Sequence, residues 1–353
     1  MDKIRKMNYE AQREERNRKR KKRRKIEACV GAIVLCGLTA FSFFVPPATW
    51  KYYVKKPKIA KLAAGDCRVH FLSVGQGDCS VIELPDGKTM VIDGGDGANG
   101  HTAYILRYLN ALGVKKPDYL VATHTDGDHT GGLAEMVSVK GAGEIFMPYV
   151  TYDGGTAFDE FLLAAKKEEI RTTFSRRGIS LSSHDSGLPY DLCFISPLSK
   201  DTPGNEYAKA NGNSADDGVV NDTSAVIYLD YFGSTVLFCG DITAEKEQAI
   251  LREAEAGLIA CDGKEITLCG VEILKAAHHG SASSSCEEFI RALSVRDAVV
   301  SAGINNAYSH PSTEVLGRFE RNGVNVHRTD YDGTVTITLK PDGTYTVDNI
   351  PAA

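Results

Sequence analysis

The segment Thr123–Gly132 places two histidines and two aspartates within six positions, in the order Thr-His-Thr-Asp-Gly-Asp-His-Thr-Gly-Gly. It follows the apolar run Tyr119–Ala122 and precedes a helix-like stretch. A strand end, a tight turn and a helix start can direct all four side chains to one point, whereas a regular strand or helix interior would point them to several sides. Neutral imidazole and carboxylate together suit Zn²⁺, Mn²⁺ or Fe²⁺, so the segment could begin a two-metal site. The alternative is a polar turn, which would explain the aspartates and glycines but not the histidines.

The N-terminal region combines a basic block with an apolar one. Residues 1–25 carry 13 Lys/Arg against four Asp/Glu, and Arg18–Lys25 is an unbroken basic run. We expect such a block to be disordered or bound to an anionic surface. The next segment, Ala28–Val45, contains no charge and approaches the roughly 20 residues that span a bilayer. Two prolines, Pro46 and Pro47, end it.

These features predict a basic cytoplasmic tail (residues 1–27), a single-pass transmembrane anchor (28–47) and a linker (48–66) that contains five lysines. The basic block on the N-terminal side places that end in the cytoplasm and the rest of the chain outside the cell membrane. A cleaved signal peptide and a buried core helix are the alternatives. The long charged region and the lack of a small-x-small cleavage site favour the anchor.

Nine cysteines are present, two of them in the apolar segment, and none forms a C-x-x-C pair. If the body is exported a disulfide could form, and Cys261–Cys269 across a short loop is the nearest candidate. We expect most of the other cysteines to be buried thiols.

From Val69 onward, strand-like and helix-like segments are interspersed, which predicts a layered α/β body. Asp201–Asn221 is rich in Gly, Asn, Asp and Ser and is predicted to be a long surface loop beside the site. Strands are predicted at 69–74, 79–84, 90–93, 119–123, 145–148, 192–195, 224–231, 235–239, 271–276, 298–301, 324–329, 334–339 and 345–347. Helices are predicted at 101–112, 130–139, 158–170, 244–256, 286–293 and 312–322.

Further polar clusters stand at the ends or entrances of predicted strands, where open sheets tend to place their sites. Each would be weak alone, because a Gly-Asp after a strand is usually a turn, but they occur together. They are Gly75-Gln76-Gly77-Asp78, Asp93-Gly94-Gly95, Asn221-Asp222-Thr223-Ser224, Gly240-Asp241-Ile242 and His278-His279-Gly280-Ser281.

This order of motifs, with Ser309-His310-Pro311 and Arg328-Thr329-Asp330, resembles the metallo-β-lactamase superfamily. Within it, the sequence is most similar to the extracellular hydrolase domain of ComEC-type DNA-uptake proteins. The resemblance covers about residues 67–340 and implies an αββα sandwich, with a hydrolase domain over residues 67–348 behind the transmembrane helix. No polytopic transport segment accompanies it, so we expect the hydrolase domain on its own anchor.

Three positions depart from the usual pattern of the superfamily. Asp126 replaces the second histidine of the first motif, as in the ComEC-type branch, and an anionic oxygen ligand makes Mn²⁺ a rival to Zn²⁺. The pair Asn221-Asp222 stands where an isolated third-motif histidine is expected. Ser309 replaces the glycine that usually precedes the late His-Pro.

The resemblance implies two divalent cations, Zn²⁺ or Mn²⁺, and a role for each motif. His124 and Asp126 would hold one ion, and Asp128 and His129 the other. Asp241 would bridge them, with one of His278 and His279 completing the second site. A shared water would attack a phosphorus or carbonyl centre. His310 would bind the scissile phosphate or protonate the leaving oxygen, with a capping or packing role before Pro311 as the alternative. Ligand-orienting or substrate-binding roles fall to Gln76, Asp78, Asp93, Asn221, Asp222 and Ser281.

Three functions compete for this site. The first, implied by the resemblance, is a phosphodiesterase with DNA as its substrate. Residues 62–353 carry 23 Lys/Arg against 41 Asp/Glu, however, whereas a protein that neutralises many phosphates normally has a basic footprint. The second is therefore a hydrolase of a small molecule such as a lactone, a cyclic nucleotide or a cell-envelope phosphodiester. The third, a non-enzymatic nucleic-acid binder, fits poorly with the retained carboxylates and histidines.

Overall fold

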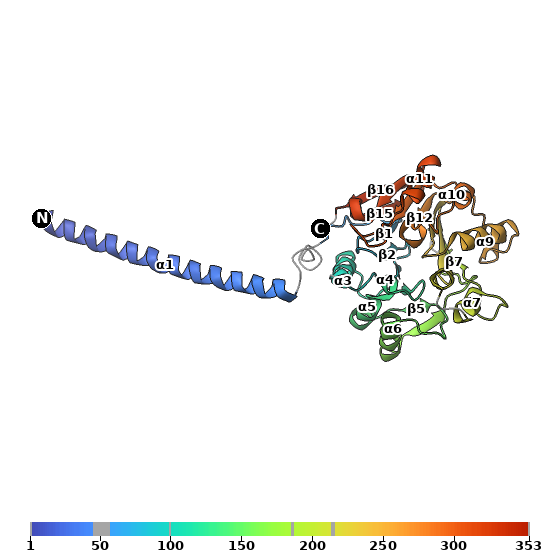
Figure 1. Cartoon of the computed structure of the whole chain (residues 1–353). Helices are drawn as coiled ribbons and strands as arrows, with labels where there is room; N and C mark the ends of the chain where they lie inside the picture. The colour runs from blue at the N-terminus through green and yellow to red at the C-terminus, as the bar shows by residue number, and fades with distance from the viewer. Residues whose placement is uncertain (1, 45–56, 99, 185–186, 213–215, 352–353) are drawn as a thin grey trace. The chain divides into compact units, whose positions relative to one another are not determined.

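The computed structural model describes residues 2–44, 57–98, 100–184, 187–212 and 216–351 (Figure 1). The chain divides into two compact units, Met1–Lys51 and Tyr52–Ala353. In the first unit, helix α1 (Asp2–Phe44) includes Arg13–Ser42, which by length and composition could cross a membrane.

Helix α1 also continues through the basic block, where disorder was one of the two predicted states. Lysine, arginine and glutamate favour helices, and the ion pairs Lys19–Glu15 and Arg23–Glu27 join successive turns. Binding of this block to an anionic surface stays a prediction.

The second unit contains two mixed sheets. The first has eight strands in the order β16-β15-β1-β2-β3-β4-β5-β6, and the second has six in the order β14-β13-β12-β9-β8-β7. Their bounds are β1 Cys67–Phe71, β2 Ser80–Glu83, β3 Thr89–Ile92, β4 Tyr119–Val121, β5 Glu144–Met147, β6 Arg171–Phe174, β7 Asp191–Ser196, β8 Val226–Tyr231, β9 Ser234–Phe238, β12 Ile273–Lys275, β13 Asp297–Val300, β14 Asn325–Arg328, β15 Thr334–Leu339 and β16 Tyr345–Ile350. A separate hairpin pairs β10 (Ala260–Cys261) with β11 (Lys264–Glu265).

The helices of this unit are α3 His101–Leu112, α4 Gly127–Thr130, α5 Leu133–Lys140, α6 Thr156–Lys167, α7 Glu206–Gly212, α8 Asp217–Asn221, α9 Ala244–Glu255, α10 Glu287–Leu293, α11 Thr313–Arg321 and α12 Thr329–Asp332, with a 3₁₀ turn η2 at Ala277–Gly280. Three apolar cores define the layers. One core, including Phe71, Phe194 and Phe238, lies between the two sheets. A second joins the outer face of the first sheet to α3, α5 and α6, and a third joins the other sheet to α9, α10 and α11 (Figure 1). The predicted αββα sandwich is confirmed.

Two predictions from the sequence were wrong. The segment 201–221 is not a long loop, because its described residues include α7 and α8; Tyr207 is buried there, and Glu206 forms a buried ion pair with Lys246 of α9. The disulfide joins Cys261 to Cys193, not to the exposed Cys269, because β7 and β10 lie side by side.

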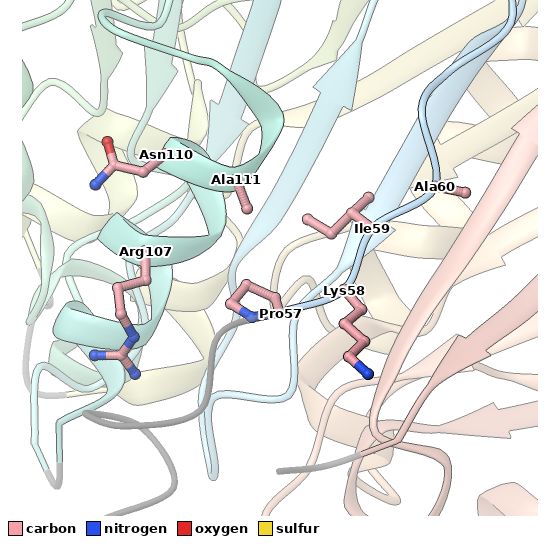
Figure 2. A pocket seen from close by; sticks show the side chains of 7 residues that line it. All are labelled: Pro57, Lys58, Ile59, Ala60, Arg107, Asn110 and Ala111. Atoms are coloured by element: carbon pink, nitrogen blue, oxygen red, sulfur yellow. The ribbon is translucent and has the colours of Figure 1, made fainter.

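The described part of the predicted linker, residues 57–66, belongs to the second unit. Ile59 packs on the core beneath α3, and the Ala60 carbonyl accepts a hydrogen bond from Arg68 at 2.7 Å. Residues 57–60 and α3 enclose a cavity of about 850 Å³ (Figure 2). None of the residues that line this cavity belongs to the histidine and aspartate motifs. The cavity is therefore separate from the predicted metal site.

The buried carboxylate of Glu247 holds the start of α10 to α9. Glu247 is only 1% exposed and accepts hydrogen bonds from the backbone N–H groups of Ser285 (2.6 Å) and Cys286 (2.8 Å). Burial outweighs these hydrogen bonds and raises the pKa of Glu247 to about 7. The chain that follows the His278-His279 turn is therefore fixed through a group that titrates near neutral pH.

We expect this carboxylate to make the domain less stable as the pH rises. Its pKa in the folded protein exceeds the usual 4.5, so its stabilising contribution is complete below about pH 4.5 and is lost as the pH rises through about 7. Glu247→Gln removes that titration, and linkage limits the effect to about 3 kcal/mol. Free energies of unfolding from pH 5 to pH 8 should fall more steeply for the wild type than for the variant. Parallel curves would contradict the prediction.

Candidate metal centre

The site lies where parallel strands of both sheets end. In the second sheet, β9, β12 and β13 run parallel, with Phe238 opposite Lys275 and Lys275 opposite Val299. Their carboxyl ends therefore meet at one edge, and the residues that follow them, Asp241, His279 and Ser301, become neighbours. In the first sheet, β3 and β4 run parallel in the same way and deliver Asp93 and Thr123.

The opening motif has the predicted local structure of a strand end, a turn and a helix start. Strand β4 ends at Val121, and α4 carries Asp128 and His129. The loop before β2 packs directly on α4, since Asp78 N–H donates to the Asp128 carbonyl at 3.2 Å. Gly77 makes this approach feasible: its φ is +151°, and a Cβ there would lie 2.4 Å from the same carbonyl oxygen.

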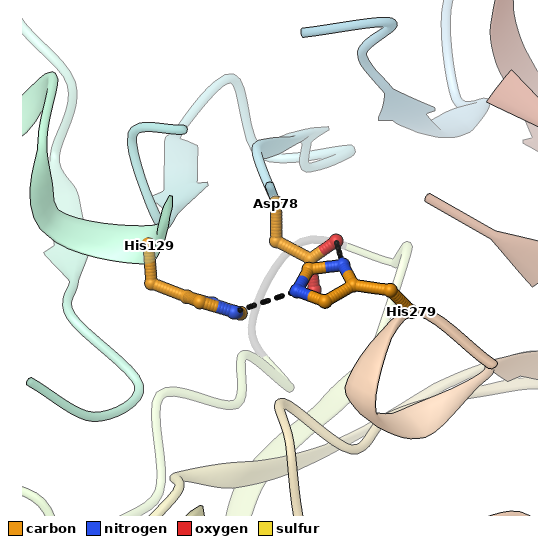
Figure 3. Close-up of side chains that lie close together, drawn as sticks. All are labelled: Asp78, His129 and His279. Carbon is orange, nitrogen blue, oxygen red and sulfur yellow. Dashed lines mark hydrogen bonds and ion pairs between the residues drawn. The ribbon is translucent and has the colours of Figure 1, made fainter. Parts of the chain in front are cut away.

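The Nε2 atoms of two histidines face each other in the cluster. His129 donates from Nδ1 to Asp93 Oδ2 at 2.8 Å, and His279 donates from Nδ1 to the Ser301 carbonyl at 3.0 Å. Their Nε2 atoms, the ring nitrogens that remain available to bind a metal ion, lie 3.3 Å apart (Figure 3). Carboxylates surround this point: Asp241 lies 3.2 Å from His129 Nε2 and 3.4 Å from His279 Nε2, and Asp128 lies 3.1 Å from His279 Nε2.

This arrangement fits divalent cations. A tetrahedral ion with bonds of about 2.1 Å separates its ligand atoms by about 3.4 Å, close to the distances just given. Two buried acceptor atoms, His124 Nε2 and Asp78 Oδ1, have no hydrogen-bond partner among the described residues. Because unpaired buried acceptors are costly, a cation is the partner that this donor set lacks. Within this cluster two groups have metal-binding spacing, His124/His129/Asp241 and Asp78/His129/His279.

The electrostatics of the protein point the same way. Burial opposes charge on His129, but Asp241 and Asp93 outweigh it and raise the pKa of this imidazole well above its usual value. Burial alone would raise the pKa of Asp241. The neighbouring His129 and His279 outweigh burial and lower this pKa well below its usual range. In the metal-free protein the cluster therefore favours protonated imidazole beside carboxylate, and a metal ion bound there would replace those protons.

The remaining predicted ligands lie at the edge of the cluster. His124 is fully buried, with Nε2 3.6 Å from Asp126 Oδ2. His278 is partly exposed, with Nε2 3.9 Å from Asp241, and its Nδ1 contacts Ser283 Oγ. Both His278 and His279 adopt left-handed backbone conformations, a strain typical of functional turns. Of the two, only His279 contacts several of the other predicted ligands.

The residues predicted to orient ligands or bind substrate separate into two groups. Asp93 and Asp78 contact the histidines of the cluster. The other side chains form hydrogen bonds outside it: Gln76 accepts from the Gly303 N–H, Asp222 accepts from Thr243 at the start of α9, and Ser281 bonds to Ser283. Asn221 is buried at the end of α8. The His310 ring packs against His278, with 5.6 Å between centroids.

Lys275 was not predicted from the sequence. It is 2% exposed, and its Nζ lies 2.6 Å from Asp78 Oδ2 and 2.8 Å from the Ala276 carbonyl. Burial opposes the charge on Asp78, but Lys275 and His279 prevail and lower its pKa. The sequence does contain a sign of this role: Lys275 is a charged residue near the end of an otherwise apolar strand, three residues before His278. Lys275 therefore fixes the carboxylate that faces His279.

A cavity of about 630 Å³ opens beside the cluster. Asp126 and Asp128 line it together with Asp96, Asp153 and Asp217. Two tyrosines, Tyr152 and Tyr308, and the predicted site residue Gln76 also belong to its wall. Neither tyrosine nor the three additional aspartates was predicted to belong to the site, because they come from separate loops without a motif. The approach to the cluster is strongly acidic.

Two facing sheets, outer helices and a histidine–aspartate cluster at strand ends define a metallohydrolase fold. Residues 72–304 match the metallo-beta-lactamase superfamily, and the chain belongs to that superfamily, whose members are mostly metal-dependent hydrolases.

Its curated relatives include competence proteins of the ComEC type. ComE operon protein 3 of Bacillus subtilis (strain 168) is 25% identical over 295 residues, covering 79% of this chain and 34% of the relative. Competence protein ComA of Neisseria gonorrhoeae is 26% identical over 269 residues, covering 76% of this chain and 32% of the relative. The chain thus spans about a third of the length of these relatives.

Solved structures of similar fold include CmlA, a diiron beta-hydroxylase from Streptomyces venezuelae, with a TM-score of 0.47 and 14% identity, covering 78% of this chain and 54% of that one. Unliganded yeast PDE1 has a TM-score of 0.42 and 10% identity, covering 74% of this chain and 97% of that one.

We expect Lys275→Met to destabilise the metal-free protein by about 3 kcal/mol, because it leaves the Asp78 carboxylate buried without its partner. Denaturant unfolding of the chelator-treated full chain in detergent measures this change. Asp78→Asn combined with Lys275→Met removes both charges and should recover much of the loss. An unchanged unfolding midpoint in Lys275→Met would show that the ion pair contributes nothing.

Proposed function

We propose that this protein is a membrane-anchored, metal-dependent phosphodiesterase that cleaves DNA outside the membrane. The observation that carries the proposal is the convergence of the His129 and His279 Nε2 atoms with the carboxylates of Asp128 and Asp241. The relatedness to competence proteins supports DNA as the substrate. The apolar part of α1, with basic residues before it, supports an anchor at residues 28–47 with a cytoplasmic N-terminus and an extracellular hydrolase domain.

The residues around the cluster have separate tasks. Two divalent cations, Zn²⁺ or Mn²⁺, bound by these side chains would activate a water molecule and stabilise the charge that develops on phosphorus. Asp93 and the Ser301 carbonyl hold His129 and His279 in the tautomers that leave Nε2 free. Asp241 and Asp128 supply negative charge from two different strand ends, while Lys275 fixes Asp78 behind them.

We assign to His310 the binding of the phosphate rather than the protonation of the leaving group. Burial and the neighbouring His278 lower its pKa, so the imidazole is neutral near pH 7. A neutral imidazole can donate one N–H to a phosphate oxygen but carries no extra proton to give away. Its Nδ1 is buried without a hydrogen-bond partner among the described residues, which leaves Nε2 as the donor that we assign to substrate.

A small-molecule hydrolase is the second candidate, because the approach to the cluster is acidic. Five aspartates line the adjacent cavity, and residues 62–353 carry an excess of 18 acidic residues. A long polyanion is repelled by such a surface, whereas a lactone, a cyclic nucleotide or a small phosphodiester presents little charge beyond the reacting group.

The full chain, purified in detergent and loaded with Mn²⁺ or Zn²⁺, decides between the candidates on three substrates: single-stranded DNA, double-stranded DNA and bis-p-nitrophenyl phosphate. The proposal expects cleavage of DNA and of the small diester, with both activities lost on chelation. Hydrolysis of the diester alone would replace the DNA substrate with a small molecule. No hydrolysis of any of the three would leave both candidates without support.

Asp241→Asn should lower both activities at least about 1,000-fold and reduce the metal content, since it removes a carboxylate that faces both histidines. His327→Ala is the matched control, because His327 pairs with Asp297 at 2.7 Å on β14 and lies outside the metal-binding groups of the described residues. Full activity in Asp241→Asn would refute the metal mechanism.

His310→Ala should reduce the cleavage of both substrates by a similar factor, about 100-fold, because a lost hydrogen bond to phosphate does not depend on the leaving group. The comparison pairs p-nitrophenolate, a good leaving group, with the alkoxide of a nucleotide, a poor one. A loss confined to the poor leaving group would identify His310 as a proton donor instead.

A further inference from the structure

We propose that His184, Asp191 and Asp262 bind a further metal ion, a divalent cation of the Zn²⁺ class, at the surface of the domain. The three side chains come from different segments: the turn before β7, the first residue of β7 and the β10–β11 turn. They share no residue with the central cluster. This site does not depend on the proposed function.

The distances match coordination by one ion. His184 Nε2 lies 3.4 Å from Asp262 Oδ2 and 3.7 Å from Asp191 Oδ1, and the three ligand atoms all lie within 4.8 Å of one another. A tetrahedral ion with bonds of about 2.1 Å separates its ligand atoms by about 3.4 Å. Imidazole with two carboxylates selects Zn²⁺ and its neighbours in the first transition row rather than Ca²⁺, which prefers oxygen ligands alone.

The surroundings hold the ligands in place. Cys261 directly precedes Asp262, and Cys193 follows Asp191 by two positions, so the disulfide between them ties together the backbone segments that carry both carboxylates. Ser180 Oγ donates to Asp262 Oδ2 at 2.8 Å and orients it. Ser183 and Tyr190 exchange backbone hydrogen bonds on either side of the turn that carries His184.

A cavity of about 420 Å³ adjoins the three ligands and leaves room for water as a fourth one. Its wall adds the carboxylate of Asp230 and one ammonium, that of Lys264, so the lining keeps a net negative charge. An ion bound here would join the turn before β7 to the β10–β11 hairpin, beside the disulfide. With three protein ligands and one water, such an ion would act as a structural cross-link between these two segments.

The test uses the untagged full chain in detergent, without reductant, equilibrated with micromolar Zn²⁺. Its zinc content is determined by mass spectrometry, and hydrogen exchange is followed in the peptides that contain His184 and Asp262. We expect His184→Ala and Asp262→Asn each to lose about one zinc per chain and the zinc-dependent slowing of exchange in these peptides. His327→Ala, which removes another histidine paired with a carboxylate, should lose neither.

Asp241→Asn separates this site from the central cluster, because it should lower zinc content while the slowing of exchange near His184 persists. Unchanged zinc content in His184→Ala would overturn the proposal. So would protection that needs millimolar Zn²⁺, because the contacts of His184 would then be ion pairs alone.

Discussion

The site depends on one electrostatic constraint: imidazole nitrogens and carboxylate oxygens meet inside the protein and need positive charge between them, either as protons on the histidines or as metal ions. His129 and His279 each use one ring nitrogen for a fixed acceptor and turn the other toward Asp241. Such a group is stable only when positive charge enters it. The cluster lies where strand ends of both sheets meet, so its charged side chains come from several strands rather than from one.

The parts of the fold that the sequence predicted well are those set by local pattern. The α3 bounds, His101–Leu112, agree with the prediction, and every other predicted strand or helix has a counterpart within a few residues, because apolar periodicity and glycine turns are local signals. The gathering of Asp128, His129 and Asp241 was also predictable, since each follows a strand whose carboxyl end must lie at the shared edge.

What the sequence did not predict depends on contacts between distant segments. The Cys193–Cys261 disulfide bridges 68 positions, and its partners are chosen by the packing of β10 on β7 rather than by spacing. Helix α7 forms in a polar segment because Glu206 pairs with Lys246 of α9 and the Tyr207 side chain is buried. The Lys275–Asp78 pair likewise joins the end of β12 to the loop before β2. Local propensity carries no information on these partners.

Charge also determines how a nucleic acid could reach the proposed active site. Ions held by the cluster would offset Asp126 and Asp128, but Asp153 and Asp217 of the same cavity remain uncompensated on the side of α6 and α8. Tyr308 stacks on His310 at 5.7 Å on another part of the rim and adds no negative charge. Because phosphates avoid carboxylates and bases stack on aromatic rings, a strand would enter along Tyr308 and His310 and bring only a short stretch of backbone to the ions. If DNA is the substrate, as proposed, the acidic body would limit the length of strand that is bound at one time.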